Sequence, residues 1–277
     1  MDDAVLGQLA ELAKAFNGIG EKPVICGGLG VFLRFRDSHG AAHNIIRATN
    51  DIDLMMTKQM VLENSHQNAI AEIITGELEY VVRAGDEHFR FMKAPNQQLD
   101  ILSPPLEGFR IDGYRVNLVK SKLHGRLTEE ARFIDEDLKT IPLDKTSDSI
   151  EVQVPSPTNL LILKLCAFDD RDKKGETERA RAHAFDIYIT VTLANRDDYL
   201  EGQKFMARHS DSQEIQRVTS IVKDKFNSVD QPGWQRVLEA TSFYPNLNAQ
   251  QKHDELENAK NRLVRWFTLL EHNYPDR

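Results

Sequence analysis

The sequence predicts an α+β protein, with an N-terminal α/β part that carries a mixed sheet and a C-terminal part made of helices. Short apolar runs suited to buried strands recur up to residue 154, whereas helical periodicity dominates after Pro155 and Pro157. With 277 residues the chain is long enough to bury two separate cores. We therefore expect an N-terminal domain over residues 1–150 and a helical domain over residues 151–277.

The N-terminal part is expected to alternate helices with strands. Apolar side chains at helical spacing predict the first helix, and Asp2 and Asp3 favour its N-terminus because they complement the helix dipole. In chain order the predicted elements are a helix over 3–16, a strand over 23–26, a helix over 29–35, a strand over 52–56, a helix over 59–75, strands over 78–83, 88–93, 99–102 and 114–118, and an alternating run over 150–154.

The C-terminal part shows helical periodicity almost throughout. The acidic and basic residues at 169–174 are nearly balanced in charge, and we interpret them as a mobile turn between two helices. The predicted helices cover 158–169, 176–194, 198–208, 211–225 and 249–271.

Composition and charge exclude several classes of protein. The formal charge of −8 and the pI near 5.6 argue against a protein that coats nucleic acids nonspecifically, because such binding depends on many contacts between basic side chains and phosphates. The two cysteines, Cys26 and Cys166, are too few for a disulfide framework and favour a reducing compartment. The acidic start of the chain and the lack of a long apolar run predict a cytoplasmic protein with no membrane contact.

The central motif is Asp51-Ile52-Asp53, within a predicted strand. Alternate side chains of a strand point to the same face, so both carboxylates face one side while Ile52 and Leu54 point into the core. Two carboxylates on one face can bind Mg²⁺. The alternative interpretation is a strand end with solvated aspartates.

Two further features belong to the same part of the chain. Gly27-Gly28 lies between a predicted strand and a predicted helix, where backbone N–H groups can approach an anion such as phosphate. Asp100 interrupts an apolar strand and could complete a metal site or accept a proton from a hydroxyl. The alternatives are a tight turn that needs positive φ, and an aspartate at a strand edge.

The order and spacing of these residues resemble the signature of the polymerase-β-like nucleotidyltransferase superfamily. The block Arg-Ala-Thr-Asn-Asp-Ile-Asp-Leu at 47–54 looks like the corresponding block of the AbiEii/AbiGii-type toxin nucleotidyltransferases, which include the MenT-type toxins. The proline-containing entry and lysine helix at 155–167, and the aspartate-containing run at 183–188, are similar to two later blocks of that family. The resemblance covers roughly residues 22–190.

The resemblance implies an enzyme that moves a nucleoside monophosphate from an NTP to an acceptor hydroxyl and releases pyrophosphate. It implies two Mg²⁺ ions, or Mn²⁺ in their place, on Asp51, Asp53 and Asp100, with Asp100 also helping to deprotonate the acceptor. The remaining implied roles concern the nucleotide: the β/γ-phosphates would contact Gly27 and Gly28, the triphosphate would contact Lys164 with Asp186 as a further active-site acid, and Arg47 and Thr49 would reach the nucleotide or its acceptor.

Three points stay open at this stage. Related enzymes often place a hydroxyl residue directly after the glycine pair, where this chain has Leu29. Lys164 is otherwise an exposed helix lysine, Asp186 a solvated partner of Arg179 or Arg181, and Arg47 and Thr49 solvated loop residues. An acceptor groove is also conceivable along basic residues that follow the sheet, namely Lys120, Lys122, His124 and Arg126.

The resemblance leaves the acceptor undecided. It suggests the 3′ end of a tRNA or a protein side chain, and a toxin neutralised by a separately encoded antitoxin protein. The alternatives are an antibiotic nucleotidyltransferase of the aminoglycoside type, or a noncatalytic nucleotide-binding module that keeps the fold. The C-terminal helical domain would complete the nucleotide cleft and the acceptor site.

Overall fold

The protein is α+β, with a mixed open sheet and ten α-helices among the residues that the computed structural model describes. The described residues are 3–38, 49, 51–62, 64–82, 89–94, 97–106, 111–112, 115–117, 123–143, 150–240 and 246–268. The chain divides into two compact units, Met1–Asp37 with Ile46–Leu160, and Ser38–Ile45 with Leu161–Arg277. The α+β class expected from the sequence is confirmed.

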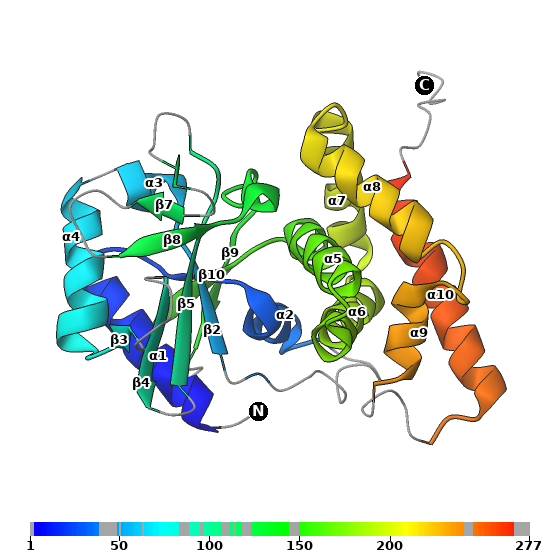
Figure 1. The fold of residues 1–277 in the computed structure, drawn as a ribbon, viewed down its shortest axis with the longest axis horizontal. Helices are drawn as coiled ribbons and strands as arrows, with labels where there is room; N and C mark the ends of the chain where they lie inside the picture. Colours follow the sequence, from blue (N-terminus) through cyan, green and yellow to red (C-terminus); the bar gives the residue numbers. More distant parts are fainter. Residues whose placement is uncertain are drawn as a thin grey trace. The chain divides into compact units, whose positions relative to one another are not determined.

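The described strands all belong to the first unit and form one sheet (Figure 1). Their order is β6-β7-β8-β5-β2-β1-β10-β9, while β4 pairs with β5 and β3 with β4. The pairs β2–β5, β5–β8 and β1–β10 are parallel, and the other pairs are antiparallel. The strands are β1 (Val24–Ile25), β2 (Asp51–Met55), β3 (Val81–Val82), β4 (Arg90–Ala94), β5 (Gln97–Ser103), β6 (Ile111–Asp112), β7 (Arg115–Asn117), β8 (His124–Leu127), β9 (Lys139–Pro142) and β10 (Glu151–Val154).

Helices pack against this sheet (Figure 1). Apolar residues of β2 and β5 that alternate with polar ones, such as Ile52, Leu54, Leu99 and Ile101, are fully buried and share one core with α1 and α4. Helix α2 packs against β2 and β10 and contributes Leu29 and Leu33 to the same core. The helices are α1 (Asp3–Gly18), α2 (Gly27–Phe35), α3 (Lys58–Leu62), α4 (Asn64–Glu72), the π-helix η2 (Ile73–Glu77) and the 3-10 helix η3 (Glu129–Ala131).

Several elements of the first unit differ from the sequence-based expectation. The helix expected over 59–75 is divided into α3 and α4 and ends in the π turn of η2, where Leu78 N donates to Ile73 O at 2.8 Å. Strands β6, β8 and β9 were not expected. β9 has the sequence Lys-Thr-Ile-Pro and lies at the edge of the sheet, where a lysine and a proline obscure the strand pattern. Strand β10 follows the expected boundary at residue 150 but pairs with β1 and β9 of the first unit.

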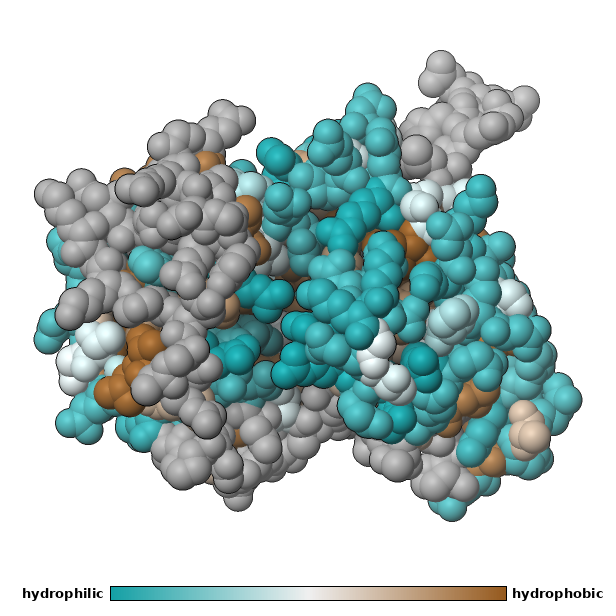
Figure 2. Space-filling model, in the orientation of Figure 1, coloured by the Kyte–Doolittle hydropathy of each residue, from teal (hydrophilic) through white to brown (hydrophobic). Residues whose placement is uncertain are grey.

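The second unit is helical, and its described helices follow the expected ones closely except for the additional short helix α9. Most of its apolar side chains, including Trp234 and Trp266, are buried, whereas Leu200 and Leu238 are exposed. Figure 2 shows that the face drawn there is mainly hydrophilic over this unit. No helix in the described ranges combines the length and the hydropathy needed to cross a membrane. The helices are α5 (Pro157–Lys173), which begins in the first unit, α6 (Thr177–Leu193), α7 (Arg196–Arg208), α8 (Gln213–Lys225), α9 (Pro232–Leu238) and α10 (Ala249–Phe267).

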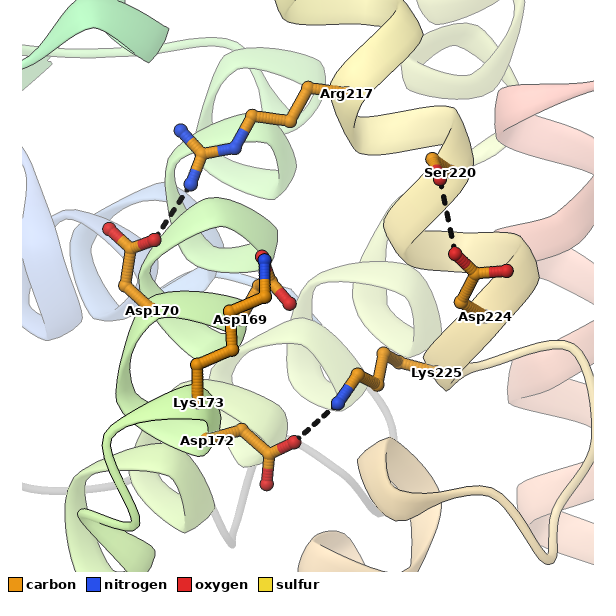
Figure 3. Close-up of polar contacts among 8 residues, drawn as sticks. All are labelled: Asp169, Asp170, Asp172, Lys173, Arg217, Ser220, Asp224 and Lys225. Carbon is orange, nitrogen blue, oxygen red and sulfur yellow. Dashed lines mark hydrogen bonds and ion pairs between the residues drawn. The ribbon is translucent and has the colours of Figure 1, made fainter.

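Residues 169–173 form the last turns of α5, so the turn expected over 169–174 is wrong (Figure 3). Their acidic side chains are held by ion pairs, since Asp170 contacts Arg217 of α8 at 2.7 Å and Asp172 contacts Lys225 at 2.6 Å. Asp169 is buried and pairs with Lys173 one turn later at 2.6 Å. The charges that suggested a solvated turn therefore fasten α5 to α8.

Gly30 of α2 allows this helix to approach β1 closely. A Cβ at residue 30 would lie 2.6 Å from the backbone oxygen of Ile25, which cannot move without disturbing β1. We expect Gly30→Ala to lower the free energy of unfolding by about 2 kcal/mol, measured by urea denaturation. The matched control is Gly7→Ala in α1, where a Cβ meets nothing within 4 Å, and this change should stabilise the protein by about 0.5–1 kcal/mol. Equal effects of the two substitutions would contradict the close approach.

Asp135 provides a prediction about pH. Its Oδ1 is buried without a hydrogen-bond partner, and burial raises the pKa of the carboxyl above its ordinary value of 3.8 although Lys58 N donates to Oδ2. The folded protein thus binds this proton more tightly than the unfolded chain, so stability falls as the pH rises above about 4. Asp135→Asn should stabilise the protein at pH 7 by roughly 0.5 kcal/mol and have no effect near pH 3. Equal gains at both values, in denaturant titrations, would contradict this.

Candidate functional site

The parallel pairing of β2 with β5 places the predicted aspartates side by side. Asp53 is the register partner of Asp100, and Asp51 is the partner of Gln98. Register partners on neighbouring strands point to the same face, so the three aspartates share one face of the sheet, opposite to the apolar residues of the core. Asp51 and Asp53 are partly exposed, whereas Asp100 is 6% exposed. The structure therefore brings together the three carboxylates that the sequence singled out.

Arg90 of β4 completes this row and was missed in the sequence. It is the register partner of Asp100 on the other side of β5, and its Nε and Nη2 donate to Oδ1 and Oδ2 of Asp100 at 3.0 and 2.9 Å. Gln98 Nε2 also donates to Oδ1 of Asp100 at 3.0 Å. Such a two-point contact fixes the carboxylate and neutralises its charge. The sequence signal was faint: Arg90 alternates with His88 on one predicted strand, and Asp100 alternates with Gln98 at the start of the other.

Gly27 brings the N-terminus of α2 against Asp53. A Cβ at Gly27 would lie 1.8 Å from Oδ2 of Asp53, and the residue has φ +65°, which a side chain would disfavour. The backbone is tied in the same place, because Cys26 N donates to Asp53 O at 2.8 Å. The side chain of Cys26 makes no capping hydrogen bond to α2. The start of this helix therefore lies beside Asp53, and a helix N-terminus favours negative charge.

Three further residues that the sequence singled out, Thr49, Arg47 and Leu29, belong to the same part of the chain. Thr49 is buried, and its hydroxyl donates to Oδ1 of Asp51, so it positions this carboxylate and is no solvated loop residue. Arg47 lies outside the described residues. Leu29 is fully buried in the hydrophobic core of the first unit. The position after the glycine pair is thus a packing position in this chain, which accounts for the missing hydroxyl.

Two of the four basic residues expected in an acceptor groove are described, and both lie on β8. Arg126 is the register partner of Leu102 on β5, so it points to the same face as Asp100, and His124 follows the same alternation. Both are partly buried. Lys120 and Lys122 lie outside the described residues. The described part of the carboxylate face thus carries positive charge on two strands, from Arg90 and from Arg126.

Lys164 and Asp186 form a buried ion pair in the second unit. Lys164 Nζ of α5 donates to Oδ2 of Asp186 of α6 at 2.6 Å, and the two side chains are only 5% and 4% exposed. The alternatives of an exposed helix lysine and of an aspartate paired with Arg179 or Arg181 are therefore wrong. Those arginines contact Glu176 and Glu178 instead. The structure joins these two predicted residues to each other.

The chemistry of the carboxylate row suits a hard divalent cation, since Mg²⁺ and Mn²⁺ prefer carboxylate oxygens. As they stand, the described residues contain no group of three His, Cys, Asp or Glu side chains placed to hold a metal ion. At this row Asp100 forms an ion pair with the guanidinium of Arg90. The carboxylate oxygens of this row are therefore the type of ligand that Mg²⁺ and Mn²⁺ prefer. Arg90 provides positive charge beside them.

Comparison with known proteins adds no assignment. The chain matches no protein-family model, and no curated protein shows significant similarity to it.

The buried pair in the second unit generates a stability prediction. Asp186→Asn would leave the ammonium of Lys164 buried without its partner, so we expect a loss of about 3 kcal/mol in urea denaturation. The double variant Lys164→Met, Asp186→Leu removes both charges and should recover most of this loss. As a control, Arg236→Met breaks a more exposed pair with Glu239 and should cost less than about 0.5 kcal/mol. A small effect of Asp186→Asn would contradict the burial of the pair.

Proposed function

We propose that this protein is a Mg²⁺-dependent nucleotidyltransferase of the cytoplasm that moves a nucleoside monophosphate from an NTP to an acceptor hydroxyl and releases pyrophosphate. The observation that carries the proposal is the register of Asp53 with Asp100, with Asp51 on the same face and the N-terminus of α2 against Asp53. Carboxylates for a metal and backbone amides for a phosphate thus occur within one short stretch of sheet. This combination supports the family resemblance of residues 22–190.

Each group has a defined task in this proposal. Asp51, Asp53 and Asp100 would hold the metal, which supplies positive charge for the phosphates and aligns them. The amides at Gly27 and Gly28 would bind phosphate oxygens, and Thr49 would keep Asp51 oriented. Phosphoryl transfer depends mainly on positioning and charge neutralisation, so these residues suffice for the main requirements.

Asp100 is the proposed acceptor of the proton from the attacking hydroxyl. Both of its oxygens contact Arg90, so this task requires the guanidinium to move or the proton to pass to another carboxylate. The resemblance implies that Lys164 contacts the triphosphate with support from Asp186, but the burial of this pair favours a structural role within the second unit. In this proposal the acceptor is a tRNA 3′ end or a protein side chain, and an antitoxin protein is the partner.

A second candidate function is a noncatalytic module that binds a nucleotide. Two observations favour it: Leu29 replaces a hydroxyl with a buried apolar side chain, and Asp100 is engaged by Arg90. Against it stands the row of aspartates, because a domain that only binds phosphates gains little from adjacent negative charges. Binding of Mg-NTP without turnover would favour this candidate.

The proposed activity is tested by label transfer. The protein is incubated with each α-³²P-labelled NTP, Mg²⁺ and either total RNA or cell extract, and labelled macromolecules are separated on a gel. We expect label on one class of acceptor, and a loss of at least about 1,000-fold in the Asp51→Asn, Asp53→Asn double variant, because the phosphates would then lack the charge that neutralises them.

The matched control is Asp137→Asn, which changes an exposed aspartate of the same unit at a backbone φ of 59° that asparagine tolerates. It should transfer label like the wild type. If the wild type labels nothing with any of the four nucleotides, or if the double variant keeps its activity, the proposed function is wrong.

A further inference from the structure

The side chain of Arg90 occupies a position that the proposed reaction does not explain. Its contact with Asp100 is set by the backbone, because the two residues are register partners on β4 and β5. The arginine side chain is 35% exposed, while the aspartate side chain is 9% exposed. The cation is therefore the solvent-accessible partner of the pair, and its anion is the inaccessible one.

Electrostatics explains why a cation is needed here. Asp53 and Asp100 are neighbours on adjacent strands, and two like charges about 5 Å apart repel by roughly 3 kcal/mol at an effective dielectric constant of 20. Asp51 adds a third negative charge on the same face. Arg90 relieves this repulsion by a two-point contact, and a divalent cation on the same carboxylates would relieve it too.

A guanidinium and a metal ion cannot both use this row without cost. Arg90 already donates a hydrogen bond to each oxygen of Asp100, and Gln98 donates another to Oδ1. If the metal takes the same lone pairs, it must displace the arginine. If it takes the remaining ones, two cations lie side by side and repel each other. Arg90 weakens metal binding in either case.

We infer that Arg90 is a resident counter-cation that competes with the divalent metal for Asp100. In the protein without metal, Arg90 neutralises Asp100. An entering metal ion displaces the guanidinium of Arg90 toward solvent. The polyphosphate of a nucleotide then provides a new anionic partner for Arg90. Metal binding is then favoured by the nucleotide and disfavoured without it. This inference rests on the proposed function because it takes the three aspartates as the metal donors.

The test measures Mn²⁺ binding to the protein alone, by the loss of the free Mn²⁺ signal in electron paramagnetic resonance. Arg90→Met keeps an unbranched apolar stem and removes the charge of the side chain. We expect its affinity for Mn²⁺ to rise about tenfold over the wild type, which corresponds to about 1.4 kcal/mol. A role of Arg90 in stability alone would leave the affinity unchanged or weaken it.

Two further variants keep the experiment decisive. Arg90→Gln removes the charge but retains a hydrogen-bond donor toward Asp100, so it should bind Mn²⁺ more tightly than the wild type even if Arg90→Met folds poorly. The matched control is Lys93→Met on the same strand, which removes a charge that pairs with Glu11 of α1, on the opposite side of the sheet. Its Mn²⁺ affinity should equal that of the wild type.

The outcomes separate this inference from the proposed function, since the titration contains neither nucleotide nor acceptor. The competition is supported if both Arg90 variants bind Mn²⁺ more tightly than the wild type and the Arg90→Met, Asp100→Asn double variant loses this gain. This conclusion does not depend on the result of the label-transfer assay. Equal or weaker binding in a folded Arg90 variant overturns the inference, and so does a lack of Mn²⁺ binding in all variants. Label transfer by the wild type would still uphold the proposed function in those cases.

Discussion

The parallel register of β2 and β5 is the constraint on which the rest of the candidate site depends. It sets Asp53 beside Asp100 while the same strands bury Ile52, Leu54, Leu99 and Ile101 on the other face. A shift of one residue would send the carboxylates into the core and the apolar side chains to the opposite face. The core therefore enforces the proximity of the like charges, and the energy of burying apolar residues offsets their repulsion.

The residues around Asp53 and Asp100 compensate for the proximity of the two carboxylates. Arg90 supplies the compensating charge across the strand pair, and Gln98 and Thr49 fix the orientations of Asp100 and Asp51. Gly27 then leaves room for Asp53, since even one added carbon would overlap its carboxylate. The glycine in the turn after β1 is therefore required both by this contact with Asp53 and by its φ of +65°.

Sequence periodicity predicted which side chains of one strand share a face, but it did not predict which residues pair between strands. The alternation in Asp51-Ile52-Asp53 predicted a shared face correctly, because a strand needs no partner to define its two faces. Arg90 was missed because its partner is set by the antiparallel register of β4 and β5, which periodicity does not reveal. Likewise, charges at 169–173 suggested a solvated turn, whereas their partners Arg217 and Lys225 come from a distant helix.

The two ion pairs discussed here differ in a way that bears on function. Lys164 and Asp186 are almost fully buried, so separating them would leave a charge without water or partner, and such a pair suits a fixed position. Arg90 and Asp100 differ because the cation is partly exposed and can regain hydration when it leaves. If a carboxylate must exchange one cation for another during a reaction, its resident cation must be able to return to water, as Arg90 can. The carboxylate row therefore has the property that an exchange of charge requires, and the buried pair does not.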